Sequence, residues 1–437
     1  MANDGTKHDR HHGAKPTVTK RSARSRRAML AAVGSSLVGL AGCTGEMPWE
    51  EELRDPGGEY RPNAIPESEI TPPAIARGEL LDDFAEPSVW APLAGERSGT
   101  SDDALVGDRA LRVTDADGRR AGVYRAFEDP IDLSERDLSV ALALDSPAGA
   151  VVTVELQAPS TDHGLISRRR VPSDLDDWIR IDVGYTDRQG EPDERGVEGM
   201  RIWVDGTDDE PVAFSLDDLR ATPGGERGGV VLTFDGRLDS AYDEILEITD
   251  EVGLAGVLAV RPSLIDEPGG LSVDRLERFD REGWDVASFP LRREPLPELS
   301  TDEQRAVIEG EHRTLVDLGF EAGARHFFTP YDRLDASTLG VVREVHETGF
   351  VFGGSPNAFP PSDPHTISTV DGTDSSAVQR LVESVLTYNQ LLVLRFGALR
   401  VDADDTASTA YLRELLAFLD AREVDVLTAS DMLDTVE

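Results

Sequence analysis

The chain has 437 residues, of which 84 are acidic and 44 are Lys or Arg, so its formal net charge is −40. Hydrophobic residues make up 39%, which is low but enough for packed cores and excludes wholesale disorder. The length fits two or three domains. A surface this acidic repels nucleic acid and anionic membranes, which argues against a DNA-binding role. The single cysteine, Cys43, excludes an intrachain disulfide framework and any multi-cysteine zinc site.

Lysine is confined to the first twenty residues. The three lysines are Lys7, Lys15 and Lys20, and all other permanent cations are arginines. An acidic chain that uses Arg in place of Lys resembles the haloarchaeal proteins, those of salt-loving archaea. This is an inference from composition and says nothing about chemistry.

The first 43 residues have the organisation of an export signal. A basic segment ends in Arg26-Arg27, and residues 28–42 form an apolar run without charge. The run has 15 residues and is shorter than the about 20 that a membrane-spanning helix needs. A basic head and a short apolar middle are typical of a signal peptide. The arginine pair resembles a twin-arginine export signal, which implies a secreted protein.

The end of this run, Leu40-Ala41-Gly42-Cys43, resembles a lipobox. That resemblance implies lipidation of Cys43 and anchoring to the outer face of the cytoplasmic membrane. The alternative is a core helix that ends in cysteine by chance. His8, His11 and His12 fit a disordered leader better than a metal site.

Residues 44–80 are rich in Pro, Gly and Glu and lack apolar periodicity, so we expect a disordered tether.

Residues 81–222 alternate between apolar and polar in short runs. We expect strands at 110–114, 139–144, 151–156, 178–183 and 200–204. Several short strands without a long helix predict a β-sandwich.

The ends of this region resemble galactose-binding-like jelly rolls, which often bind carbohydrate. The resemblance rests on Leu81-Asp82-Asp83-Phe84, on Trp90 and on the segment 214–219. Trp178 and Trp203 are either sugar-stacking platforms or partly buried packing residues.

A Pro- and Gly-rich segment, 223–229, precedes a region in which strands and helices alternate. The expected strands are 230–233, 257–260, 284–288, 326–328, 350–352, 391–396 and 424–427, and the expected helices are 240–250, 273–281, 301–318, 336–347, 376–388 and 406–421. This alternation over 228–437 predicts a parallel (β/α) barrel, whose chemistry lies on the loops that follow the strands.

Several of those loops resemble the motifs of the polysaccharide deacetylases, the NodB-type carbohydrate esterases. The matching segments, in order, are 229–235, 283–288, 328–331 with 335–339, 347–350 and 423–428. The resemblance implies a hydrolase in which a divalent metal such as zinc is held by two His and one Asp, beside an aspartate base and a late histidine acid.

In this sequence only the base position keeps its residue type, as Asp235. The metal-binding positions fall on Gly236, Phe289 and Arg293, and the position of the acid falls on or near Gly397. Glycine and phenylalanine offer no ligand atom, and arginine repels a cation. We therefore expect no metal and no cofactor.

Other residues are candidates for a remaining substrate pocket. Asp239 follows Asp235 by four residues, and Pro330 and Tyr331 lie on a loop after a strand. Arg293 is expected to pair with Asp235, or Asp235 to cap the following helix. His312, His326, His346 and His365 lack the spacing of a metal site.

Three functions remain open. The first is a pseudoenzyme that binds glycans or the cell surface. The second is an active deacetylase of N-acetylated polysaccharides with an unusual site. The third is a structural lipoprotein that docks a partner.

Overall fold

The computed structural model describes residues 77–100, 104–175, 177–206, 210–235, 241–397, 399, 401 and 408–435. The expected leader with Cys43, most of the tether, Gly236 and Asp239 lie outside the described residues. The first strand, β1 (Glu79–Asp82), begins inside the range expected for the tether, so the sandwich starts two residues earlier than expected. Within the described residues, no helix has the length and apolar character needed to span a membrane.

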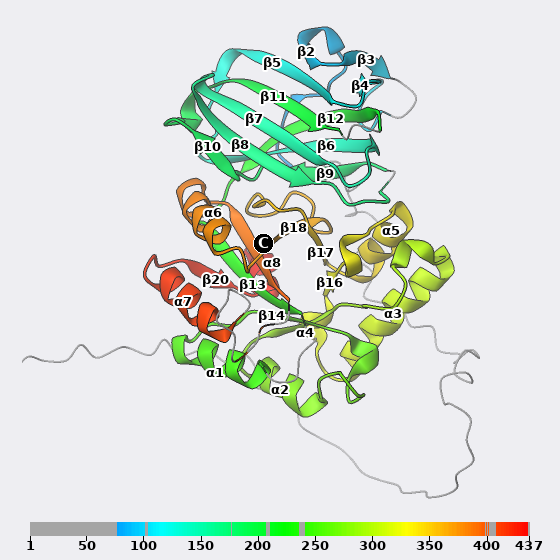
Figure 1. Cartoon of the computed structure of the whole chain (residues 1–437), viewed down its shortest axis with the longest axis vertical. Coiled ribbons are helices and arrows are strands. Elements are labelled where there is room, and N and C mark those ends of the chain that lie inside the picture. Colours follow the sequence, from blue (N-terminus) through cyan, green and yellow to red (C-terminus); the bar gives the residue numbers. More distant parts are fainter. Residues whose placement is uncertain are drawn as a thin grey trace, which may run out of the picture. The chain divides into compact units, whose positions relative to one another are not determined.

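The amino-terminal region is a sandwich of two antiparallel sheets (Figure 1). One sheet, here named the β12 sheet, has the order β3-β4-β12-β6-β9, and β1 also pairs with β12. The other, named the β11 sheet, has the order β10-β8-β7-β11-β5-β2. The bounds are β2 (Ala91–Ala94), β3 (Glu96–Thr100), β4 (Ala110–Asp115), β5 (Arg120–Ile131), β6 (Arg136–Ser146), β7 (Val151–Ser160), β8 (His163–Arg170), β9 (Ile179–Asp182), β10 (Asp187–Gln189), β11 (Val197–Asp205) and β12 (Val212–Pro223).

Period-two alternation explains which side chains fill the sandwich. On β11, Met200, Ile202 and Val204 are buried, and the residues between them point away from the core. The predicted jelly-roll residues Phe84 and Trp90 are also core: their rings stack at 5.0 Å. They serve packing and present no surface for a ligand.

The carboxy-terminal region is a parallel barrel, as the alternation predicts. Seven described strands, β13 to β19, form a closed ring in which β13 pairs with both β14 and β19. An eighth strand, β20, pairs with the amino-terminal half of β13, at Gly229–Val231, whereas β14 pairs with its carboxyl-terminal half. The strand bounds are β13 (Gly229–Asp235), β14 (Val257–Val260), β15 (Asp285–Ser288), β16 (His326–Phe328), β17 (Thr348–Phe352), β18 (Ile367–Asp371), β19 (Leu391–Phe396) and β20 (Asp425–Leu427).

The helices of this region are α1 (Tyr242–Val252), α2 (Val273–Arg281), α3 (Thr301–Asp317), α4 (Glu321–Ala324), α5 (Ala336–Val345), α6 (Ser375–Tyr388), α7 (Thr409–Asp420) and α8 (Ala429–Asp434). The last of them, α8, closes the amino-terminal end of the barrel, because Ala429 and Met432 join the interior core and Ser430 bonds to Asp285, whereas the others pack on the outside. The strand β18 was not predicted, because its sequence Ile-Ser-Thr-Val-Asp carries only two apolar residues.

The connection from β17 to β18, residues 353–366, contains no helix. The sandwich packs against this connection instead. Arg169 donates to the side chain of Asn357 at 3.0 Å, and the carboxylate of Asp137 accepts from the amide of Phe359 at 3.0 Å. The sandwich therefore covers the side of the barrel that a crossover helix would otherwise cover.

This joint is close-packed and polar. A Cβ atom at Gly184 would lie 1.9 Å from the carbonyl oxygen of Pro356, so only glycine fits there. Gln390 donates to Asp137 at 3.3 Å and accepts from the amide of Tyr185 at 2.8 Å. Burial raises the pKa of Asp137 to about 7, against the opposing effect of these hydrogen bonds.

Candidate functional site

Side chains along β13 and β19 point alternately into and out of the barrel. This brings an aspartate and an arginine together at the barrel mouth, the carboxyl end of the parallel strands. Val231 on β13 and Val393 on β19 belong to the interior core, so the residues in phase with them, Asp235 and Arg395, also point inward. The paired register sets Thr233 beside Arg395. Both charged side chains therefore sit at the last inward position of neighbouring strands.

Arg395 forms ion pairs with two carboxylates. Its Nε lies 3.2 Å from Asp235 Oδ1 and its Nη2 lies 3.4 Å from Asp235 Oδ2, while Nη1 lies 2.8 Å from Asp332 Oδ1. The guanidinium also lies over the ring of Phe289, 5.3 Å from its centroid. These four residues are named the Arg395 cluster.

The cluster is largely withdrawn from water. Asp235 is 8% exposed, and its backbone carbonyl accepts from the hydroxyl of Tyr242 at 2.6 Å. Burial lowers the pKa of Arg395, but the charges of Asp235 and Asp332 outweigh burial, and the net effect is a raised pKa. The guanidinium is therefore a fixed positive charge at the mouth.

The ion pair expected for Asp235 exists, but its partner is Arg395 and not Arg293. The side chain of Arg293 is exposed, and its backbone carbonyl accepts from the hydroxyl of Tyr331 at 3.4 Å. The expected helix cap is wrong as well: α1 begins at Tyr242, after Ala241, without a side-chain cap. A signal for Arg395 was present in the sequence, as the one charge in the strand Leu-Leu-Val-Leu-Arg-Phe.

Little space remains beside Asp235. The crevice that it lines together with Gly397 has a volume of about 10 Å³, which is room for about one water molecule. Gly397 itself is exposed, and a Cβ there would meet no atom within 4 Å. A side chain would fit at the position of the acid, but glycine supplies none.

The donor set at the mouth does not fit a divalent metal. Phe289 places a hydrocarbon ring where the resemblance requires a histidine, and Arg395 holds the remaining carboxylate with a permanent cation. Within the part of the chain that the structure describes, no group of three or more His, Cys, Asp or Glu could hold a metal ion.

Tyr331 is the exposed aromatic residue of the mouth. Its side chain is 46% exposed, whereas the preceding Pro330 is buried. Tyr331 and Asp332 both adopt left-handed backbone angles, with φ of 59° and 55°. Two consecutive non-glycine residues in this region are costly, and such strain is found at binding and catalytic sites. The turn presents the tyrosine ring outward and the Asp332 carboxylate to Arg395.

His326 lies at the opposite end of the barrel. It opens β16, and its ring nitrogens contact the hydroxyls of Thr348, at 2.8 Å, and Ser430, at 3.0 Å. The Ser430 hydroxyl in turn donates to Asp285 at 2.7 Å. Burial lowers the pKa of His326 to about 4, although Asp285 opposes the shift. This network is structural and does not supply the mouth with a histidine.

The other histidines of the barrel also lie away from the mouth. The rings of His312 and His346 meet edge to face at 5.2 Å, and His365 contacts the backbone carbonyl of His346 at 3.0 Å. Burial lowers the pKa of all three imidazoles. They pack neutral between the helices and the sheet.

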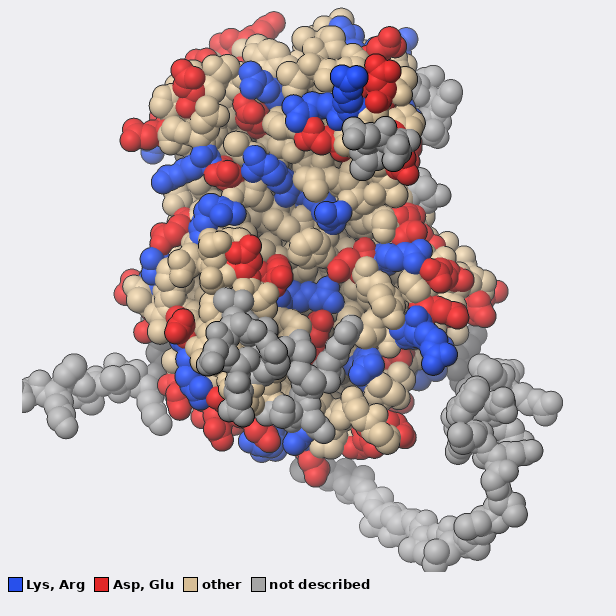
Figure 2. Space-filling model, in the orientation of Figure 1, with Lys and Arg blue, Asp and Glu red and all other residues tan. Residues whose placement is uncertain are grey.

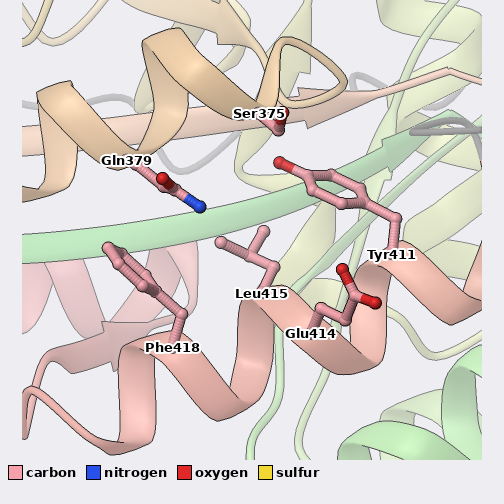
Figure 3. Close-up of a pocket in the computed structure, with 6 residues that line it drawn as sticks. All are labelled: Ser375, Gln379, Tyr411, Glu414, Leu415 and Phe418. Carbon is pink, nitrogen blue, oxygen red and sulfur yellow. The ribbon is translucent and has the colours of Figure 1, made fainter.

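A hollow of about 180 Å³ lies between α6 and α7 on the outside of the barrel. In it the hydroxyl of Tyr411 points toward Ser375, and Phe418 closes the other end (Figure 3). Burial and the nearby carboxylates raise the pKa of Tyr411 to about 12, so this phenol stays neutral. The hollow offers no reactive group.

The outward face of the β11 sheet carries a second group of side chains. Trp203 and Arg201 on β11 alternate with the core residues, and Tyr124 on β5 pairs with Arg201. Glycines seat the two rings: a Cβ at Gly122 would lie 2.6 Å from Cβ of Trp203, and one at Gly199 would lie 3.1 Å from the ring of Tyr124. The two glycines therefore leave room for the neighbouring aromatic residues.

Arginines and carboxylates alternate around those rings. Arg201 pairs with Glu155 at 2.9 Å, and Arg120 lies 5.4 Å from the centroid of the Trp203 ring. Figure 2 shows basic side chains distributed over the visible face of the sandwich, among acidic ones. The face thus combines half-buried aromatic residues with charge-paired hydrogen-bonding groups.

No family model and no curated protein matches the chain. Solved structures resemble each region at low scores. The family 4 carbohydrate esterase from Streptomyces lividans has a TM-score of 0.33 and 15% identity, and the match covers 46% of this chain and 91% of that chain. A CE4 family pseudoenzyme from Bacillus anthracis has a TM-score of 0.34 and 14% identity over 48% of this chain and 66% of that one.

A solved structure also resembles the sandwich at a low score. A family 11 carbohydrate-binding module of a cellulosomal cellulase from Clostridium thermocellum matches with a TM-score of 0.27 and 13% identity, over 34% of this chain and 95% of that module. At these values the similarity says nothing about ligands or reaction, which have to follow from the residues of this chain.

Removing the cation of the mouth should destabilise the protein. Arg395→Ala leaves the buried carboxylate of Asp235 and the partly exposed one of Asp332 without their partner, and we expect a loss of about 3 kcal/mol in the free energy of unfolding, mainly from Asp235. Urea denaturation measures it. The control is Arg413→Ala, which removes an exposed pair with Glu244 and should cost less than about 1 kcal/mol. Equal losses in the two variants would show that the Arg395 cluster is not a stabilising unit.

Acid should weaken the fold through His326. Its pKa is 6.5 in the unfolded chain and about 4 in the folded one, so the unfolded state takes up the proton first as the pH falls. The contribution of His326 is complete above about pH 6.5 and is lost toward pH 4, with a total of about 3 kcal/mol.

Denaturation curves between pH 4 and 7 test this. We expect the free energy of unfolding to depend less steeply on pH in His326→Gln than in the unmodified protein. Ser430→Ala keeps the imidazole and should lower stability at every pH while leaving most of the slope. An unchanged slope in His326→Gln would contradict the prediction.

Proposed function

We propose that the protein is an exported, lipid-anchored glycan-binding protein whose deacetylase-like barrel has lost metal-dependent deacetylation. The observation that carries the loss is the Arg395 cluster. A base needs a free carboxylate and room for water and substrate, but Asp235 is engaged by a guanidinium beside a crevice of about 10 Å³. The two alternatives are an active N-deacetylase and a structural lipoprotein.

The β11 sheet supports glycan binding. Half-buried aromatic rings on the outward face of a sheet stack on sugar rings, and the arginine–carboxylate pairs around Trp203 offer hydrogen bonds to sugar hydroxyls. The ligand we propose is a cell-surface polysaccharide.

Binding to a glycan array, followed by isothermal titration with the full chain, tests the function. We expect Trp203→Ala to weaken saccharide binding about fivefold to tenfold, because one stacking contact contributes about 1 kcal/mol. Trp178→Ala, at the edge of the β12 sheet, is the matched control and should bind normally. Absence of any saccharide binding would favour the structural lipoprotein.

Acetate release separates the pseudoenzyme from the enzyme. The protein with an added divalent metal should release no acetate from oligomers of N-acetylglucosamine. Release that Asp235→Ala abolishes would establish the deacetylase alternative.

The proposed anchor lies outside the described residues and rests on the sequence Leu40-Ala41-Gly42-Cys43. We expect the protein in the membrane fraction of expressing cells, and Cys43→Ser in the medium or soluble fraction, because the lipidated thiol is removed. The same distribution for both variants would reject the lipid anchor.

A further inference from the structure

The sandwich reaches the barrel mouth through the carboxyl end of β8. The amide of Arg170, the last residue of β8, donates to the carbonyl of Gly353 at 2.8 Å, and Gly353 directly follows β17. Next along the chain, Ser173 forms a parallel bridge with Arg333. The strand β8 therefore ends at the rim that carries Tyr331.

Arg333 holds this rim in place. Its Nε and Nη2 lie 2.9 and 3.0 Å from the carboxylate of Asp174 in the sandwich, and its Nη1 lies 2.6 Å from Glu298 in the barrel. Because Arg333 follows Tyr331 and Asp332 directly, this bidentate contact ties the turn of Tyr331 to the sandwich.

A row of side chains leads from that rim to Trp203. Arg170 and Arg168 are exposed on β8, two residues apart and on the same face. Arg168 pairs with Thr153 on β7, and Thr153 pairs with Trp203 on β11. Strands lie about 4.8 Å apart, so Trp203 is about 10 Å from Arg168 across the sheet.

The joint between the sandwich and the barrel contains buried hydrogen bonds and a close backbone approach at Gly184. The contacts Arg169–Asn357, Asp137–Phe359 and Gly184–Pro356 hold the sandwich on the barrel. The two aromatic platforms, Trp203 and Tyr331, are therefore fixed relative to each other before any ligand binds, which removes an ordering cost.

We propose that one linear polysaccharide chain binds across both regions, stacking on Trp203 and Tyr331, with Arg168 and Arg170 donating hydrogen bonds to its hydroxyls between them. This inference rests on the proposed glycan-binding function and adds the barrel mouth as a second contact. A long polymer suits a fixed span of this kind better than a single sugar, because the second platform is engaged within the same complex. The mouth thus keeps a binding role after losing its reaction.

The test is a length series with the full chain. Isothermal titration uses two series of oligosaccharides, one of β-1,4-linked N-acetylglucosamine and one of β-1,3-1,4-linked glucose. Each series contains a tetrasaccharide and a decasaccharide. We expect the decasaccharide to bind more tightly than the tetrasaccharide. Tyr331→Ala should weaken the decasaccharide about fivefold to tenfold and leave the tetrasaccharide unchanged, whereas Trp203→Ala should weaken both.

Tyr331→Phe keeps the ring and should bind the decasaccharide normally, which separates stacking from the hydroxyl contact. Circular dichroism and urea midpoints confirm that each variant is folded. If the oligosaccharides bind but Tyr331→Ala changes no affinity, the spanning proposal is wrong and the sandwich function stands. If Tyr331→Ala weakens the tetrasaccharide as much as the decasaccharide, the mouth is a site of its own and the proposal is overturned. If no oligosaccharide binds, the proposal falls together with the function on which it rests.

Discussion

A parallel barrel needs cover on every side, and this requirement determines how the two regions of the protein are joined. The connection between β17 and β18 supplies no helix, and the sandwich fills that place. Its contacts combine apolar packing, in which Leu334, Leu339 and Tyr388 join the core of the sandwich, with buried polar groups. A buried arginine, a buried aspartate and a glutamine each have partners across the joint. Satisfied buried polar contacts specify one arrangement more strictly than an apolar patch does, because a shift of either region would leave them unpaired. The orientation of the sandwich on the side of the barrel follows from this.

In the Arg395 cluster, one arginine holds two carboxylates together at the barrel mouth. Asp235 and Asp332 converge on one point, and two unpaired carboxylates there would repel each other. One guanidinium forms ion pairs with both, and it also lies over the ring of Phe289. Unlike a bound ion, this charge is covalently part of the chain and cannot dissociate. The cluster therefore favours the fold and keeps Asp235 engaged in an ion pair.

Much of the architecture was predictable from the sequence, because long elements carry a clear period. The strands around Leu232 and Val393 and the helix around Leu315 appeared where expected. The partner of Asp235 was not predicted, because it comes from a strand 160 residues away, and only the pairing register of β13 with β19 brings the two together. Arg293 was a plausible partner by motif position, but its side chain is exposed at the rim. The short strand β18 was missed for lack of apolar residues.

The pairing of β13 has a consequence for how the protein is made. This strand, the first of the barrel, completes its hydrogen bonds with β19 and β20, which lie near the end of the chain. When only the first half of the barrel has left the ribosome, β13 still has an unpaired edge. Unpaired strand edges can pair with other chains. Closure depends on contacts of high sequence separation, which form slowly. The barrel is therefore completed only once β19 and β20 have been synthesised, and the nascent chain is most exposed to aggregation before that point.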